Sequence, residues 1–183
     1  MTRLINDLLT LSKLETEEHI RPEKTIELPP VLNQVAATLG VRAKERGMKI
    51  DINLPKDLPA VAGNTDELTQ VFQNLVSNAV KYGSKDTQIR IDVSGSVPIP
   101  DTEQQSVSVS VINLGEGVPQ EDISRLTERF YRVDKGRSRS MGGTGLGLAI
   151  VKHIVARHRG YLEIESELGG ETTFTVYLPH ATA

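Results

Sequence analysis

The order of helical and strand-like segments along the chain is the feature that most constrains its fold. Residue periodicity predicts helices over Val31–Arg46, Thr65–Tyr82 and Gly145–His158. It predicts strands over Met48–Leu54, Gln88–Ser94, Ser106–Asn113, Tyr161–Ser166 and Thr172–Leu178. Strands and helices do not alternate regularly, and the last two strands are joined by a turn at Gly169-Gly170. This order predicts an α/β (α+β) sandwich, in which helices cover one face of a mostly antiparallel mixed sheet.

Glycine and capping residues predict where these helices begin and end. Gly47 is placed to end the first of them as a C-cap. Asn64 and Glu67 have the spacing of a capping box at the start of the second helix, which Gly83 ends.

The N-terminal residues predict a short helix that cannot stand alone. Leu4, Leu8 and Leu11 recur at spacings of four and three residues, which gives an amphipathic face. A lone helix of about four turns is marginal in water, so this one needs a partner helix. We therefore expect residues 1–16 to belong to a helical bundle, residues 17–24 to be a polar linker and residues 25–183 to form the main domain.

Composition and missing motifs exclude several classes of protein. The net charge of −3 over 183 residues argues against a general nucleic-acid binder. The absence of cysteine excludes disulfides, thiolate chemistry and cysteine-type zinc sites. No P-loop or dinucleotide glycine motif, no HExxH and no protein-kinase HRD or DFG motif is present. No signal peptide or run of about 18 apolar residues is found either, so we expect a soluble, cytoplasmic domain.

One polar helical face stands out within the helix Thr65–Tyr82. Asn74 and Asn78 lie four residues apart and Lys81 follows one turn later, so the three share a face. The rest of that segment consists largely of Val, Leu, Phe and Ala. The pattern fits either a hydrogen-bonded polar patch or a Mg²⁺ site, because amide oxygens are hard ligands for that ion.

Two glycine segments and a basic segment follow. Asn113-Leu-Gly115-Glu-Gly117 ends a strand and indicates either a turn or a close approach to a ligand. The run GGTGLGL (residues 142–148) leads into a helix N-terminus, which favours an anion. The basic segment between them (residues 123–140) is either a solvated loop or a lid that closes over phosphates.

Taken in this order, the segments resemble the catalytic ATP-binding domain of bacterial sensor histidine kinases. NLVSNAVKYG resembles the asparagine box, NLGEG the first glycine box, TERFYR the phenylalanine box and GGTGLGL the second glycine box. The resemblance covers residues 25–179 and implies the Bergerat ATP-binding fold. MTRLINDLLTLSKLE is similar to the end of the family's dimerisation and phosphoacceptor domain, and the C-terminal part is most similar to phosphate-regulon sensor kinases.

The resemblance implies ATP and Mg²⁺ as cofactors and assigns a role to each site residue. Asn78 would bind Mg²⁺, while Asn74, Lys81 and Arg132 would lie at the phosphates as the catalytic set. The full set of implied nucleotide contacts is Asn74, Asn78, Lys81, Tyr82, Asn113, Gly115, Gly117, Arg132, Gly143, Thr144, Gly145, Leu146 and Gly147. Asn113 would face the adenine amine, and Gly115 and Gly117 would let the base approach.

The chain departs from the family pattern at two positions. Asn113 stands where the family usually has an aspartate, and Thr127 where it usually has a phenylalanine. No phosphoacceptor motif surrounds any histidine, at positions 19, 153, 158 or 180, so we expect a fragment of a longer kinase. That parent could be anchored in the inner membrane.

The resulting expectation is an ATP-dependent kinase domain that phosphorylates a histidine outside this chain. The phosphoryl group would pass to a response regulator, and the parent kinase would form a homodimer through its dimerisation helices. One alternative is a degenerate nucleotide-binding module without phosphotransfer. An ATPase clamp is a further alternative, which Asn74 disfavours because hydrolysing relatives carry a glutamate there and an amide cannot act as a general base.

Overall fold

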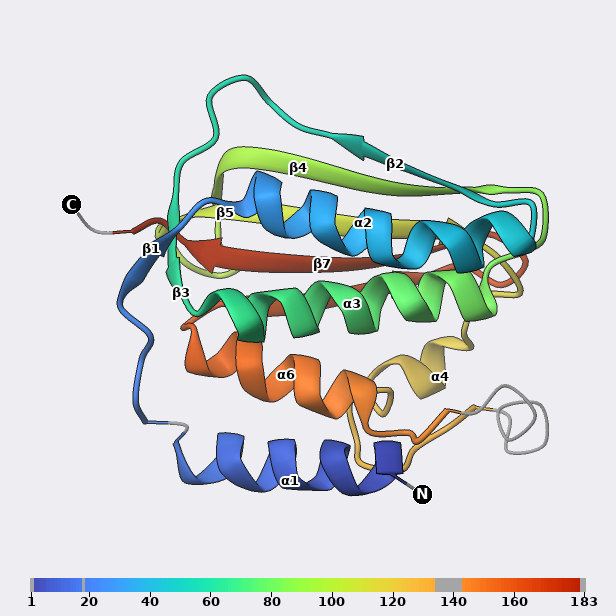
Figure 1. The fold of residues 1–183 in the computed structure, drawn as a ribbon, viewed down its shortest axis with the longest axis horizontal. Helices are drawn as coiled ribbons and strands as arrows, with labels where there is room; N and C mark the ends of the chain where they lie inside the picture. Colours follow the sequence, from blue (N-terminus) through green and yellow to red (C-terminus); the bar gives the residue numbers. More distant parts are fainter. Residues whose placement is uncertain (1, 18, 134–142, 182–183) are drawn as a thin grey trace.

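The chain forms two layers in the computed structural model, which describes residues 2–17, 19–133 and 143–181. Figure 1 shows helices α2, α3 and α6 over one face of a sheet, with α1 next to α6. The helices are α1 (Thr2–Thr16), α2 (Leu28–Glu45), α3 (Thr65–Tyr82), α4 (Gln120–Ile123) and α6 (Gly147–Arg157). The strands are β1 (Lys24–Ile26), β2 (Lys49–Asn53), β3 (Val61–Gly63), β4 (Gln88–Pro98), β5 (Gln105–Leu114), β6 (Tyr161–Ser166) and β7 (Glu171–Pro179).

The main sheet has five strands in the order β2-β4-β5-β7-β6. β2 pairs parallel with β4, whereas the other neighbouring strands pair antiparallel. Val107, Val109 and Val111 alternate along β5 and are fully buried in the core that the helices share with the sheet. The predicted sandwich with a mostly antiparallel mixed sheet is confirmed.

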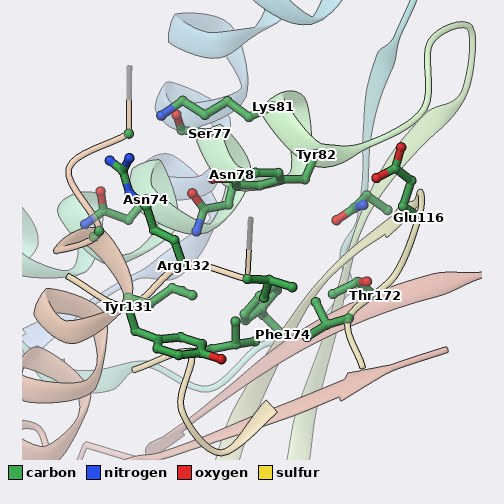
Figure 2. A pocket seen from close by; sticks show the side chains of 18 of the residues that line it. Asn74, Ser77, Asn78, Lys81, Tyr82, Glu116, Tyr131, Arg132, Thr172 and Phe174 are labelled. Atoms are coloured by element: carbon green, nitrogen blue, oxygen red, sulfur yellow. The ribbon is translucent and has the colours of Figure 1, made fainter. Parts of the chain in front are cut away.

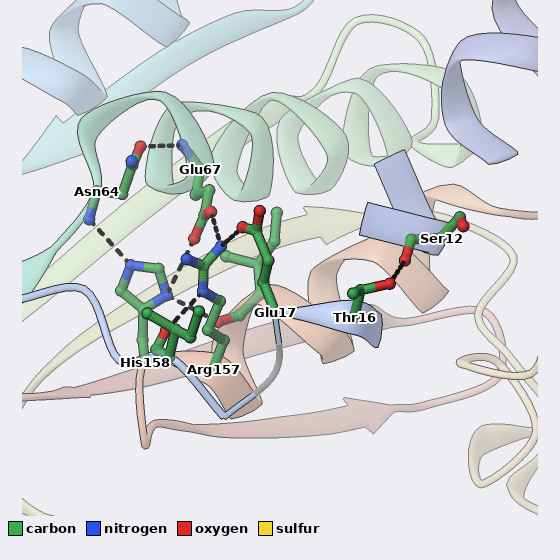
Figure 3. Close-up of polar contacts among 9 residues, drawn as sticks. Ser12, Thr16, Glu17, Asn64, Glu67, Arg157 and His158 are labelled. Atoms are coloured by element: carbon green, nitrogen blue, oxygen red, sulfur yellow. Dashed lines mark hydrogen bonds and ion pairs between the residues drawn. The ribbon is translucent and has the colours of Figure 1, made fainter. Parts of the chain in front are cut away.

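Helix α3 begins and ends at the predicted residues. The Asn64 side chain accepts hydrogen bonds from the backbone N–H groups of Asp66 and Glu67. The reciprocal half of the predicted capping box is wrong, because the Glu67 carboxylate turns to Arg157 and the Asn64 N–H donates to His158 Nε2 at 3.1 Å (Figure 3). The start of α3 is therefore tied to the end of α6 rather than closed on itself.

Other element boundaries differ from the prediction for local reasons. β1 and β3 form a separate antiparallel pair, and at three residues each they are too short to show a periodicity. β4 continues past the predicted end to Pro98 because a register shift between Ser94 and Val97 interrupts its alternation without ending the strand. α6 begins at Gly147 rather than Gly145, since Gly145 has a φ of +73° that no right-handed helix accepts.

Helix α1 is fixed to the rest of the structure by apolar and polar contacts. Leu11 of the predicted apolar face is buried in the common core together with Leu14, whereas Leu4 and Leu8 of that face are exposed. Asp7 Oδ2 accepts a hydrogen bond from the Thr144 hydroxyl at 2.8 Å. In the described part of the chain, no helix combines the length and the apolarity that crossing a membrane requires.

The segment after α1 is held in place as well. Arg157 donates from Nε to the carbonyl oxygen of Ile20 at 2.8 Å, and its Nη1 lies 3.2 Å from the Glu17 carboxylate (Figure 3). The predicted linker also ends one residue early, because β1 begins at Lys24. The division into residues 1–16, 17–24 and 25–183 stays a prediction.

Candidate functional site

The predicted site residues gather at one pocket beside the C-terminal half of α3. The other walls come from the end of β5, the segments on either side of residues 134–142, and β7 (Figure 2). The lining consists of Asn74, Ser77, Asn78, Lys81, Tyr82, Asn113, Glu116, Gly117, Val118, Leu126, Tyr131, Arg132, Val133, Gly143, Thr144, Gly145, Gly147, Leu148, Thr172 and Phe174. Every predicted site residue except Gly115 and Leu146 belongs to this set.

Helix α3 presents its polar face to the pocket. Asn74, Asn78 and Lys81 lie on this face at the spacing of successive turns (Figure 2). Residues between them, such as Leu75 and Val76, are fully buried in the core. The amphipathic pattern of α3 therefore fixes which way the two amides and the ammonium group point.

The start of α6 approaches α3 closely at Asn74. A Cβ atom added to Gly147 would lie 3.4 Å from Asn74 Oδ1. The Asn74 Nδ2 atom is buried and has no hydrogen-bond partner among the described residues. Since buried amide groups are normally paired, this donor would gain from a polar partner that came within its reach.

The residues before α6 connect the pocket to the phenylalanine-box segment. The Gly145 carbonyl accepts a hydrogen bond from the Phe130 N–H at 2.8 Å. Thr144 Oγ1 accepts one from the Leu146 N–H at 3.3 Å, at an α6 N-terminus whose N-cap residue provides no side-chain cap. Among the described residues, the backbone N–H groups of the first turn of α6 thus have no side-chain partner beside the pocket, as an anion site requires.

The two predicted residues that do not line the pocket support its walls. The Leu146 side chain is fully buried in the core. Gly115 forms an isolated bridge with Gly83, and a Cβ atom added to it would lie 2.7 Å from the Tyr82 carbonyl oxygen. Gly115 therefore lets the end of β5 approach the end of α3. It supports the pocket wall from behind and does not line the pocket.

The two ends of the pocket differ in charge. Lys81, Asn74 and Arg132 lie on one side in Figure 2, whereas Thr172 lies on the other. Asn113 is buried at the end of β5, opposite Thr172 in the strand register. Its amide can both donate and accept hydrogen bonds. The apolar side chains of the lining are Val118, Leu126, Val133, Leu148 and Phe174.

The segment that carries Arg132 is held against α4 by the residue before it. The Tyr131 hydroxyl donates to Asp122 Oδ1 at 2.6 Å, and the Arg125 guanidinium lies 4.1 Å from the centre of the Tyr131 ring. The hydrogen bond to Asp122 raises the pKa of the Tyr131 hydroxyl, so it stays protonated. Tyr131 also lines the pocket, a role that the sequence analysis did not assign to it.

Sequence analysis missed further lining residues, including Ser77, Thr172 and Phe174. The period-2 alternation of β7 places Thr172 and Phe174 on one face, but which face meets a pocket depends on the tertiary fold. Gly142 and residues 134–140 of the predicted lid lie outside the described residues.

The donor set of the pocket fits Mg²⁺ better than a metal that needs a protein cage. Among the described residues no group of three or more His, Cys, Asp or Glu side chains could hold a metal ion. The Asn78 amide oxygen is a hard oxygen donor in the lining. Mg²⁺ keeps several waters and commonly shares phosphate oxygens, so a single protein ligand is compatible with its binding.

Known proteins with similar sequences are sensor kinases. The chain is 40% identical to the phosphate regulon sensor protein PhoR of Pseudomonas aeruginosa, over 99% of this chain and 39% of PhoR. It is 35% identical to the sensor histidine kinase WalK of Bacillus subtilis, over 98% of this chain and 28% of WalK. The chain thus spans well under half the length of these curated relatives.

Solved structures agree with this similarity. Full-length ShkA in complex with AMPPNP matches 99% of this chain and 36% of its own, with a TM-score of 0.82 and 28% identity. The catalytic domain of histidine kinase ThkA has the same fold, with a TM-score of 0.72 over 86% of this chain and 95% of its own at 22% identity. Residues 63–182, which contain every described residue of the pocket lining, match the family described as histidine kinase-, DNA gyrase B- and HSP90-like ATPase. The chain therefore belongs to this family of ATPase domains.

Proposed function

We propose that this chain binds Mg-ATP and transfers the γ-phosphoryl group to a histidine that lies outside these 183 residues. The observation that carries the proposal is the convergence of the α3 polar face, Arg132 and the N-terminus of α6 on one pocket, in a chain of this ATPase family. The similarity to an AMPPNP-bound kinase structure supports the same nucleotide class.

The polarity of the pocket orients ATP. Its phosphates would lie toward Lys81, Arg132 and the α6 N-terminus, where cations and backbone donors favour anions. The base would enter beside Asn113 and Thr172, where one amide can read its polar edge. Tyr82 and Gly117 would flank the nucleotide from the ends of α3 and β5.

Asn78 would hold the metal ion through its amide oxygen. Mg²⁺ bound there would neutralise charge on the transferring phosphates. Asn74 would donate its unpaired Nδ2–H to a phosphate oxygen, and Lys81 and Arg132 would hold the phosphates by charge. These residues then contribute mainly positioning and electrostatic stabilisation.

Transfer to a protein is favoured over hydrolysis by the groups near the phosphate end. Asn74 is an amide, which cannot take a proton from water at neutral pH. The carboxylate in the described lining belongs to Glu116, which Figure 2 places across the pocket from Asn74. Among the described lining residues, none near Asn74 would therefore serve a water molecule at the γ-phosphate as a general base.

The histidines of this chain are poorly placed to accept the phosphoryl group. None of the four lines the described pocket. His158 is fully buried, and His180 Nε2 lies within hydrogen-bonding distance, 2.8 Å, of the Gly95 carbonyl oxygen. We accordingly propose an acceptor in a dimerisation domain of a homodimeric parent kinase, a response-regulator receiver domain as the next acceptor, and a cytoplasmic location.

A titration and a transfer assay test the proposal. Wild type should bind ATP more tightly with Mg²⁺ than without it, and Asn78→Ala should lose that Mg²⁺-dependent gain while keeping its fold by circular dichroism. A dimerisation domain carrying the histidine, added in trans, should gain acid-labile label from radioactive ATP. The chain alone should gain none.

Two results would contradict parts of this proposal. Unchanged affinity in Asn78→Ala would remove its assignment as the metal ligand. Tight ATP binding with no transfer to any supplied dimerisation domain would favour the degenerate regulatory module instead.

A further inference from the structure

The C-terminal end of α3 carries Lys81 and Tyr82, and its last carbonyl groups need partners from elsewhere. The final carbonyls of any helix lack the N–H groups that would follow in the helix. Gly83 has φ −66° and ψ 151°, so it does not take the left-handed conformation that commonly caps helices. Its N–H donates to the Ala79 carbonyl at 2.9 Å, which leaves the carbonyls of the following residues to be satisfied.

Arg46, at the end of a different helix, satisfies them. Its guanidinium donates to the carbonyl oxygens of Lys81 at 2.6 Å and Gly83 at 3.0 Å, and also to that of Val80. The planar fork of arginine presents several donors at fixed angles, which lysine cannot do. A cation at this position also balances the negative end of the α3 dipole.

Arg46 is itself held on both sides. It is the C-cap residue of α2, where its N–H donates to the Ala43 carbonyl at 2.9 Å. Its own carbonyl accepts from the Asp86 N–H at 3.1 Å, and the next residue, Gly47, has a φ of +70°. The side chain thus starts from a fixed backbone and reaches its acceptors while half-buried.

The same junction continues into the wall that carries Asn113. The Ser84 N–H donates to the Leu114 carbonyl at 2.8 Å, and Gly83 bridges to Gly115. Movement of the α3 end would therefore shift the end of β5 as well. Arg46 lies outside the pocket lining but behind both of these walls.

We propose that Arg46 is a positioning residue for the nucleotide site. It fixes the last turn of α3, and through it Asn78, Lys81 and Tyr82, against the end of β5. It also offsets the partial negative charge that the α3 carbonyls would otherwise present near the phosphates. The effect on ATP rests on the proposed function, whereas the effect on the α3 backbone does not.

The test compares four variants of the 183-residue chain. Arg46→Ala removes the cap, and Arg46→Lys keeps a cation without the fork. Arg42→Ala is the matched surface control, because Arg42 is exposed in the last turn of the same helix. Val35→Ala is the stability control, because it opens a cavity at a fully buried position of α2, away from the pocket.

Amide NMR without nucleotide gives the first result. Arg46→Ala should shift the signals and speed the hydrogen exchange of residues 80–84, while Arg42→Ala leaves them unchanged. Unchanged signals and exchange in Arg46→Ala would overturn the inference, whatever the chain does with ATP.

Calorimetric titration with Mg-ATP gives the second result. Arg46→Ala should weaken affinity by about tenfold, since small displacements of site groups carry large penalties. The affinity of Arg46→Lys for Mg-ATP should lie between those of Arg46→Ala and wild type. Val35→Ala should bind Mg-ATP as wild type does, despite a lower Tm. Loss of affinity in Val35→Ala equal to that in Arg46→Ala would reduce Arg46 to a stability role and overturn the inference. No binding by wild type would contradict the proposed function instead.

Discussion

At the residue scale, the two glycines before and at the start of α6 differ in what a side chain would meet. Gly145 has a φ of +73°, and an added Cβ atom would lie 2.9 Å from Phe130 Cα. Gly147 has ordinary helical geometry, and its added Cβ atom would first meet Asn74 Oδ1 at 3.4 Å, inside the pocket. One glycine is thus required by the backbone, whereas the other keeps space for a ligand.

This difference predicts opposite effects of two alanine substitutions. Gly147→Ala should keep or raise the free energy of unfolding, because alanine is favoured over glycine in helices by up to about 1 kcal/mol. It should weaken ATP binding by about tenfold and leave adenosine binding unchanged, because the methyl group would occupy the phosphate end. Gly145→Ala should lower the Tm as well as the ATP affinity, because strain at positive φ costs about 1–3 kcal/mol. Thermal unfolding and titration with both ligands decide the matter, and equal loss of ATP and adenosine in Gly147→Ala would contradict it.

At the element scale, the bounds of α3 were predictable and the short strands were not. Its apolar period, the Asn64 cap and Gly83 all point to the same boundaries, and its Asn74–Lys81 face became a pocket wall. β1 and β3 have three residues each, and their pairing joins segments far apart in the sequence. Gly115 illustrates the limit for the site, since its motif marked the region but only the packing of β5 against α3 showed what it contacts.

Helix α1 provides a test of the predicted division of the chain. Its amphipathic pattern predicted a helix that needs a partner, and of its described side chains only Leu11 and Leu14, near its C-terminal end, pack into the shared core. Leu11→Asp combined with Leu14→Asp should release α1, since a free helix of its length is marginal in water. Hydrogen exchange should then show residues 2–16 unprotected and α2, α3 and α6 still protected.

The control for this prediction lies on the other face of α1. Leu9 is 65% exposed, so Leu9→Asp should leave the exchange of residues 2–16 as in wild type. Loss of protection throughout the chain in the double variant would mean that residues 25–183 do not form a separate domain.

At the scale of the whole molecule, a polar cluster ties together α3, α6 and the segment after α1. Arg157 is buried and bonds to Glu67 and to the Ile20 carbonyl, while its neighbour His158 bonds to the start of α3 (Figure 3). Burial raises the pKa of the Glu67 carboxyl, which Arg157 partly opposes. None of these groups lines the pocket, so the cluster serves the assembly of the elements rather than the ligand.

His158 makes this cluster sensitive to pH. Its Nε2 accepts from the Asn64 N–H at 3.1 Å, so the neutral ring carries its proton on Nδ1, 2.8 Å from the Ile154 carbonyl oxygen. A second proton would place an N–H against the Asn64 N–H. Burial, with Arg157 and Arg21 nearby, lowers the pKa of His158 below its ordinary value of 6.5.

The sign of the effect on stability follows from this lowered pKa. Well above pH 6.5 the ring is neutral in the folded and unfolded chains, so His158 contributes no pH dependence there. As the pH falls through 6.5, His158 becomes protonated in the unfolded chain but stays neutral in the folded chain. The free energy of unfolding therefore decreases until the pH reaches the pKa of His158 in the folded chain. Glu67 acts in the opposite direction. Its pKa is raised in the folded chain, so as the pH falls the folded chain binds this proton before the unfolded chain does, which adds stability. Urea unfolding between pH 5 and 8 should therefore show a steeper loss of stability toward acid in wild type than in a variant without this histidine. His158→Gln has an amide that cannot titrate but can still accept a hydrogen bond from the Asn64 N–H. It should make the free energy of unfolding less dependent on pH, by an amount that corresponds to at most one bound proton. An unchanged slope would mean that His158 has the same pKa in the folded and unfolded chains, and that the hydrogen bond from Asn64 does not form as described.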